Sequence, residues 1–260
     1  MKFRSPEEFA KSSVLAVQEY SLLCVRAVAN LFTAPRYWAD IYTQADSIGV
    51  GSLPIVLLTG FFTGCVLALQ SATALAAFGA KNVTGQLVSL SMVKELGPVL
   101  TSLMVSGRNA SGMASELGSM QVTEQIDAMR ALGTDPIRKL VTPRIVSTVV
   151  MLFFLTIISD AVGTLGGAMV SIFMLGLDGS QYFHIAYQTL LYPDVLQGLV
   201  KPIFFGFIIA SIGCFFGMKT RGGTQGVGRS TTQAVVFSSV IIIFADFLLT
   251  QVLLTLFPPI

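Results

Sequence analysis

The chain has 260 residues, of which 53% are hydrophobic and 12% are charged, and its formal net charge is +2. The charged fraction is roughly half of the 25% or so that is typical of soluble domains, which is too little to cover a soluble fold of this size. This composition excludes a disordered chain, a collagen, a disulfide scaffold and an ordinary soluble enzyme. It favours an all-α, polytopic membrane protein.

Five long segments with few charged residues predict five transmembrane helices. A helix needs about 20 mostly apolar residues to cross the hydrocarbon core of a bilayer. Pairs of glycines four residues apart recur inside three of the segments and predict close helix packing. We therefore expect residues 1–46 to form an N-terminal segment and residues 47–260 to form one five-span domain. The segments are 47–80, 82–107, 145–177, 195–218 and 233–257, and the glycine pairs are Gly60/Gly64, Gly163/Gly167 and Gly213/Gly217.

The distribution of lysine and arginine predicts the orientation in the membrane. Five of these residues precede the first span, five follow the second and three follow the fourth, thirteen of the sixteen in the chain. We assign Lys81 and Lys201 to the opposite side and Lys94 to the interior of a span. The positive-inside rule then places the N-terminus in the cytoplasm and the C-terminus outside.

Residues 6–32 are expected to form an amphipathic helix. Ser5, Pro6 and Glu8 have the pattern of a capping box with proline at the first helical position. The segment lacks the compact apolar core and small-residue cleavage site of a signal peptide. Such a helix can lie in the bilayer interface or pack on the protein itself, and the pattern leaves both alternatives open.

The loop of about residues 116–144 is the richest polar segment of the chain. Helix-forming residues run from about 119 to 132, and Gly133 is a typical residue to end a helix. The polar residues of this helix lie beside an apolar stripe, which predicts a docking element for a partner protein, with a solvated connector as the alternative. The polar residues are Glu124, Asp127 and Arg130, and the stripe is formed by Ile126, Met129 and Leu132.

Apart from Lys201, which lies near the start of the fourth span, four charged residues lie inside the predicted spans, where charge is costly and often functional. Lys94 and Glu95 are adjacent, so their side chains point about 100° apart on a helix and each needs its own partner. We expect these two residues to lie at a cavity or a gate. For Asp160 and Asp246 we expect structural ion pairs.

Several kinds of chemistry lack support in the sequence. The cysteines (Cys24, Cys65 and Cys214) are far apart, and one histidine, His184, makes no metal site with them, so we expect no metal. The glycine-rich segment 219–232 contains no G-x-x-x-x-G-K-[ST] motif, and we interpret it as a flexible or tightly turned loop. We expect no catalytic residues and no nucleic-acid partner.

Four polar stretches resemble the MlaE (YrbE) family, the permease subunits of lipid-transporting ABC systems. They are LSMVKELGPV at 90–99, GRNASGMASELGSM at 107–120, TEQIDAMRALGTDP at 123–136, and GGTQGVGRSTTQAVV at 222–236, which is followed by Asp246. Together they extend over most of residues 50–250. Lys94 stands where some members have arginine, so the bidentate geometry of a guanidinium would be lost there.

The resemblance implies a bacterial inner-membrane homodimer with two ATP-binding subunits on the cytoplasmic side and a ring of MCE-domain subunits outside. ATP and magnesium would bind to the partner ATPase and not to this chain. The segment with Glu124, Asp127 and Arg130 corresponds to the coupling helix that docks into the ATPase. The lipid site implied by position comprises Leu75, Phe78, Lys94, Glu95 and Leu96, with phospholipid as the cargo.

Two other functions are compatible with parts of the sequence. A secondary transporter could use Lys94, Glu95, Asp160 and Asp246 as an ion or proton relay, although five spans without an inverted repeat argue against it. A non-transporting subunit that anchors partners in the membrane is the other alternative. An intramembrane enzyme is the weakest interpretation, because no nucleophile and base occur together.

Overall fold

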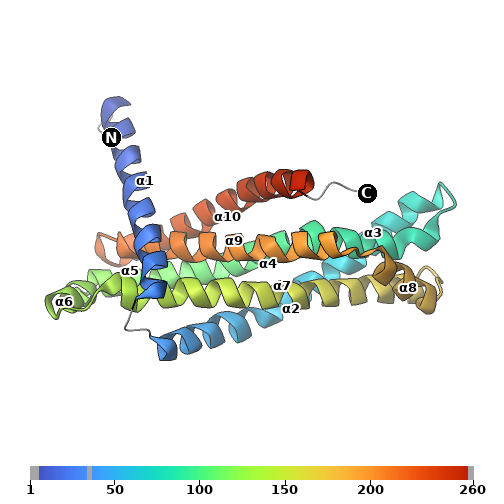
Figure 1. Cartoon of the computed structure of the whole chain (residues 1–260), viewed down its shortest axis with the longest axis horizontal. Coiled ribbons are helices and arrows are strands. Elements are labelled where there is room, and N and C mark those ends of the chain that lie inside the picture. The colour runs from blue at the N-terminus through green and yellow to red at the C-terminus, as the bar shows by residue number, and fades with distance from the viewer. Residues whose placement is uncertain (1–5, 34–36, 257–260) are drawn as a thin grey trace.

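The computed structural model describes residues 6–33 and 37–256, and this part of the chain is helical with no strand. Within these described residues, five helical units are long and apolar enough to cross a membrane, which confirms the predicted number of spans. Four of them run side by side as an elongated bundle, and the fifth packs on one side of it (Figure 1). The units are Trp38–Ala76, Lys81–Val122, Ile137–Phe173, Tyr192–Met218 and Gly223–Leu256.

The spans differ in how continuous their helices are. The first is the single helix α2 (Trp38–Ala76), the fourth is α9 (Tyr192–Met218) and the fifth is α10 (Gly223–Leu256). The second and third contain π-helical turns. The second comprises η2 (Lys81–Val83), α3 (Thr84–Ser91), η3 (Met92–Leu96), α4 (Gly97–Val105), η4 (Ser106–Ala110) and α5 (Ser111–Val122), and the third comprises η5 (Ile137–Val141) and α7 (Thr142–Phe173).

Short helices cap the two ends of the bundle. At one end, α6 (Gln125–Ala131) joins the second span to the third. At the other end, α8 (Gly179–Thr189) packs against α3 and α7. Figure 1 shows α6 and α8 at opposite ends, which are called the α6 end and the α8 end below.

Two π-helical turns are placed where a proline disturbs the helix. Proline lacks a backbone N–H, and its ring collides with the carbonyl four residues before it. For Pro98 that carbonyl belongs to Lys94 in η3, and for Pro143 it belongs to Lys139 in η5. The wider turn accommodates each proline. In η3 it also sets the directions of the side chains of Lys94 and Glu95.

Glycines bring the spans into close contact, as the sequence predicts. A Cβ atom on Gly64 would lie 1.8 Å from the carbonyl oxygen of Gly163, and one on Gly60 would lie 3.0 Å from that of Ser159. These contacts hold α2 against α7 along their length. The same kind of contact joins α9 to the second span, where Gly213 meets Ala110 and Gly217 meets Leu117 and Ala114.

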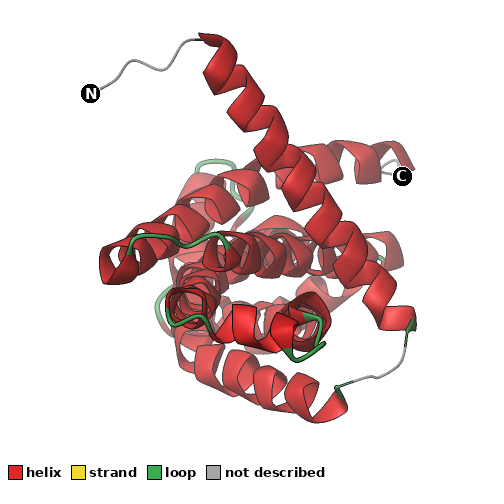
Figure 2. Ribbon diagram, turned by 90° about the vertical axis from the view of Figure 1, so that its left-hand side faces the viewer, coloured by secondary structure: helices red, strands yellow, loops and turns green. Residues whose placement is uncertain are grey.

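Helix α1 (Pro6–Ala29) crosses the α6 end of the bundle, as the view along the bundle shows (Figure 2). It packs on the domain through the buried Leu23 and Ala27, and the hydroxyl of Tyr20 lies 2.8 Å from Ser211 Oγ. Burial raises the pKa of Tyr20 to about 12, so this phenol stays neutral. The opposite face exposes apolar side chains, including Val14 and Val17. The helix therefore packs on the domain and keeps an exposed apolar face. The predicted capping residue Ser5 lies outside the described residues.

One predicted loop is helical. Helix α10 begins at Gly223 and includes most of the glycine-rich segment 219–232. Backbone turning is confined to Gly222 and Gly223, whose φ angles are 91° and 66°. The glycines at 226 and 228 continue the helix, and Gly226 allows it to lie against the carbonyl of Arg221.

Candidate functional site

A buried lysine joins three helices inside the bundle. The side chain of Lys201, on α9, is 1% exposed, and its Nζ lies 2.9 Å from Asp246 Oδ1 on α10. The same ammonium group forms an ion pair with Glu95 in η3. Thr250 of α10 donates its hydroxyl to Glu95 Oε1 at 3.3 Å. Spans two, four and five are therefore connected by one charged cluster.

A second ion pair lies next to this cluster. Lys94 Nζ is 2.7 Å from Asp194 Oδ1, and the other carboxylate oxygen of Asp194 accepts the backbone N–H of Leu191 at 3.2 Å. Asp194 thus caps the start of α9 and neutralises Lys94. The adjacent charges Lys94 and Glu95 have separate partners, as the 100° between neighbouring helical positions predicts.

The prediction that placed Lys201 on the outer side of the membrane is wrong. Lys201 lies about two and a half turns into α9, or about 14 Å by helical rise, and its ammonium is buried between two carboxylates. The lone cation in an apolar run was the available signal, because an unpaired lysine is rarely tolerated inside a span. Asp194, the partner of Lys94, gave no such signal, since it lies at a predicted helix end.

Asp160 does not form the predicted ion pair. Its side chain is buried in α7, and within the described part of the chain no cation lies within ion-pair distance of it. Its Oδ1 has no hydrogen-bond partner there and occupies the space beside Gly97, where a Cβ atom would lie 1.6 Å away. The carboxyl group fills a gap between α7 and α4.

An apolar groove lies beside η3. Its volume is about 350 Å³, and Leu96 lines it together with residues of α2, chiefly Phe62, Val66 and Gln70. The other two apolar residues of the predicted lipid site lie beyond this part of α2. Leu75 is half-buried near the end of α2, and Phe78 is 84% exposed just after the helix ends. The structure therefore brings Leu96 together with the middle of α2. Leu75 and Phe78 belong to the α8 end.

The predicted docking helix is shorter than the sequence suggests. The run expected at about 119–132 is broken after Val122, because Thr123 leaves the helix and Glu124 adopts a left-handed conformation with φ 59°. Helix α6 then runs from Gln125 to Ala131 and is anchored by the fully buried Ile126. Gly133, with φ 77°, follows it as predicted.

The polar face of α6 is exposed at the end of the bundle. Asp127 and Arg130 form an ion pair of 2.7 Å with both side chains 53% exposed. Arg130 also borders a groove of about 280 Å³ that includes Glu19 and Lys219, which form an ion pair between α1 and the C-terminal end of α9. A small, firmly anchored helix thus presents charged groups to any protein that binds this end.

Comparison with known proteins assigns the chain to a family. The model of the family described as Permease MlaE matches residues 41–252. The chain belongs to the MlaE permease family. A probable ABC transporter permease protein of Rickettsia typhi is 42% identical to it over 90% of both chains. The intermembrane phospholipid transport system permease protein MlaE of Haemophilus influenzae is 35% identical over 84% of both chains. The chloroplastic protein trigalactosyldiacylglycerol 1 of Arabidopsis thaliana is 37% identical over 88% of this chain and 66% of its own.

Membership of this family confirms the resemblance in the four polar stretches. MlaE permeases are membrane subunits of ABC transporters that work with other subunits. The charged cluster of Glu95, Lys201 and Asp246, the groove at Leu96 and the exposed α6 are therefore features of a permease. No group of three or more metal-ligating side chains occurs in the part of the chain that the structure describes.

Proposed function

We propose that this permease moves phospholipids between the bacterial inner membrane and an outer-side MCE-domain subunit, with energy from a separate ATPase. The observation that carries the proposal is the similarity, over 84% of both chains, to a permease named for intermembrane phospholipid transport. The apolar groove at Leu96 and the ammonium group of Lys94, two residues away in η3, support it, since an acyl chain needs an apolar surface and a phosphate needs a cation.

The proposed assembly is a homodimer with two ATP-binding subunits at the α6 end and a ring of MCE-domain subunits at the α8 end. The α6 end would face the cytoplasm, because many basic side chains gather there. The chain itself would hydrolyse no ATP. ATP and magnesium would bind to the partner ATPase.

The lipid would bind between two permease copies. Leu96 and the neighbouring α2 side chains would contact its acyl chains, and Leu75 and Phe78 would extend this surface toward the α8 end. The ammonium group of Lys94 would release the carboxylate of Asp194 and bind the lipid phosphate in its place, because the carboxylate and the phosphate both offer anionic oxygens. Glu95 would hold Lys201 in place while this exchange occurs.

Coupling would be mechanical. Closure of the ATPase dimer would push α6 through Glu124, Asp127 and Arg130. The motion would pass into α5 and along the second span, where the Lys201 cluster connects it to the fourth and fifth spans. Spans that move together would narrow the space between the two copies and expel the lipid.

Transfer of labelled phospholipid from proteoliposomes that contain the co-purified complex tests this function. ATP should drive transfer, and an ion gradient without ATP should not. The buried Lys201 cluster gives a specific reason to include the gradient, because charged relays of this kind occur in ion-coupled transporters. Transfer that follows the gradient would establish the secondary-transporter alternative, and absence of transfer and of bound lipid would indicate an anchoring subunit.

A further inference from the structure

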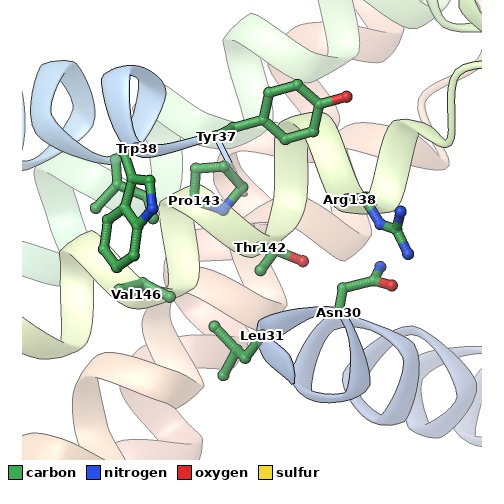
Figure 3. A pocket seen from close by; sticks show the side chains of 9 residues that line it. Asn30, Leu31, Tyr37, Trp38, Arg138, Thr142, Pro143 and Val146 are labelled. Atoms are coloured by element: carbon green, nitrogen blue, oxygen red, sulfur yellow. The ribbon is translucent and has the colours of Figure 1, made fainter. Parts of the chain in front are cut away.

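A small cavity lies at the α6 end, between the end of η1 (Asn30–Phe32), the start of α2 and the start of the third span. Its volume is about 130 Å³. Asn30, Arg138 and Thr142 provide its polar lining, and Leu31, Trp38 and Val146 contribute apolar lining. Figure 3 shows Arg138 and Asn30 together on one side, with Trp38 and Val146 on the other. The cavity is therefore amphipathic.

The polar side of the cavity offers donors to an anion. Arg138 donates Nη2 to Thr33 Oγ1 at 2.8 Å, and the buried Nδ2 of Asn30 has no acceptor among the described residues. The neighbouring Lys139 is neutralised by Asp40 and lies 4.4 Å from the ring centroid of Tyr37. A guanidinium and an amide that converge on one cavity suit a phosphate oxygen.

A separate apolar groove lies further along the seam between α2 and α7. This groove measures about 330 Å³ and is lined by Tyr42, Val50, Met151 and Phe154 among others. Trp38, Tyr42, Ala45 and Gly49 follow one another at helical spacings, so the cavity and the groove share one face of α2. Asp46 borders the groove about 12 Å along the helix from Trp38. Its carboxylate would repel an anionic headgroup, which therefore binds at the end of the seam where Arg138 lies.

The position of the seam indicates a lipid as its occupant. The cavity lies where the first and third spans begin, and Trp38 and Tyr42 are 65% and 77% exposed there. Tryptophan and tyrosine at this level are typical of the boundary between headgroups and hydrocarbon. Basic pockets between spans at the cytoplasmic surface recognise anionic headgroups. The groove at Leu96 has different lining residues, which lie in the middle of α2 and in η3.

We propose that the seam between α2 and α7 binds one anionic phospholipid of the surrounding bilayer. Its phosphate contacts Arg138 and Asn30, and an acyl chain follows the groove toward Met151 and Phe154. This lipid is a resident of the seam and is distinct from the cargo of the proposed transport function.

Trp38 provides a direct test because it is the only tryptophan of the chain. The full-length chain is reconstituted in phosphatidylcholine bilayers that contain a minor fraction of brominated phosphatidylglycerol or brominated phosphatidylcholine, with the bromine atoms near the headgroup. Quenching of Trp38 should report a preference of about fivefold for the anionic lipid, the effect of one basic residue near the membrane surface.

Matched variants separate the site from general surface charge. Arg138→Gln should abolish the preference, and so should Val146→Phe, which fills the cavity and leaves the charge in place. Arg221→Gln removes an exposed cation outside the cavity and should leave the preference intact, as should Thr33→Val, which removes only the hydrogen bond to Arg138.

Equal quenching by the two brominated lipids in the wild-type chain would overturn the proposal. So would a preference that survives in Arg138→Gln or in Val146→Phe. Inorganic phosphate in the buffer should leave the quenching unchanged, and competition by it would assign the cavity to a soluble anion.

Discussion

Gly64 of α2 and Gly163 of α7 meet backbone to backbone, with only 1.8 Å between the position of a Cβ atom on Gly64 and the carbonyl oxygen of Gly163. No side chain can rotate away from such a contact, so one of the two helices has to move if a methyl group is added. Gly64→Ala is expected to destabilise the chain by about 1–3 kcal/mol, the usual cost of overpacking a tight interior.

Thermal unfolding of the purified chain in detergent measures this cost. Gly112→Ala is the matched control, because a Cβ atom there has no neighbour within 4 Å and alanine favours the helix. We expect a lower unfolding temperature for Gly64→Ala and an equal or higher one for Gly112→Ala. Equal unfolding temperatures of the wild type and Gly64→Ala would show that the two helices separate without cost.

Replacing Lys201 with methionine is expected to destabilise the bundle. The variant keeps the length of the side chain but leaves Glu95 and Asp246 facing each other without a cation. Removing one partner of a buried ion pair costs about 3–5 kcal/mol, and the lower end applies because these carboxylates are 40% and 21% exposed.

The triple variant Lys201→Met, Glu95→Gln and Asp246→Asn tests the physical reason. It removes the charges together, so it should recover much of the stability that Lys201→Met loses. Thr250→Val, which removes only a hydroxyl donor to Glu95, should have a small effect. If the triple variant is no more stable than Lys201→Met, uncompensated charge is not the cause of the loss.

The sequence was sufficient to predict the number of spans and the glycine contacts, and it was insufficient to predict the ion-pair partners. Apolar runs and glycines at i,i+4 are local patterns, and each follows from one helix alone. Lys201 and Glu95 are separated by much of the chain, so their pairing depends on how three spans pack. The same limitation explains the wrong expectation for Asp160, whose surroundings are set by Gly97 on another helix.

The break in the docking helix shows a different limitation. Residues 119–132 are helix formers, and Glu124 is a residue that ordinarily continues a helix. In the structure it takes a left-handed conformation so that Ile126 can turn into the core beside Leu117 and Leu140. Tertiary burial of one isoleucine therefore overrides the local helix propensity.

Lys94→Ala is expected to reduce the phospholipid that co-purifies with the transport complex. A charged hydrogen bond to a phosphate contributes about 1.5–3 kcal/mol, so bound lipid should fall about tenfold or more at limiting lipid. Quantitative mass spectrometry of lipid extracted from the complex measures it. Unchanged lipid would remove Lys94 from the proposed site.

Two variants control for the ion pair of Lys94. Lys94→Arg keeps the cation and should retain the lipid. Asp194→Asn removes the competing charge and can still accept the backbone N–H of Leu191, so it should bind at least as much lipid as the wild type. Loss of lipid in Asp194→Asn would indicate that the Lys94–Asp194 pair shapes the site.

Reversing the charges on α6 is expected to uncouple the permease from its ATPase. The double variant Glu124→Lys and Asp127→Lys keeps Ile126, which anchors the helix, so the change is confined to the exposed face. Like charges that face each other at an interface cost several kcal/mol of binding free energy. The weakened contact with the ATPase should lower lipid-stimulated ATP hydrolysis about tenfold or more. Hydrolysis by the co-purified complex is measured, with its assembly followed by gel filtration.

Asp127→Glu is the control variant, because it keeps the charge and should preserve activity. A charge-reversed complex that assembles and turns over normally would place the ATPase contact elsewhere at the α6 end.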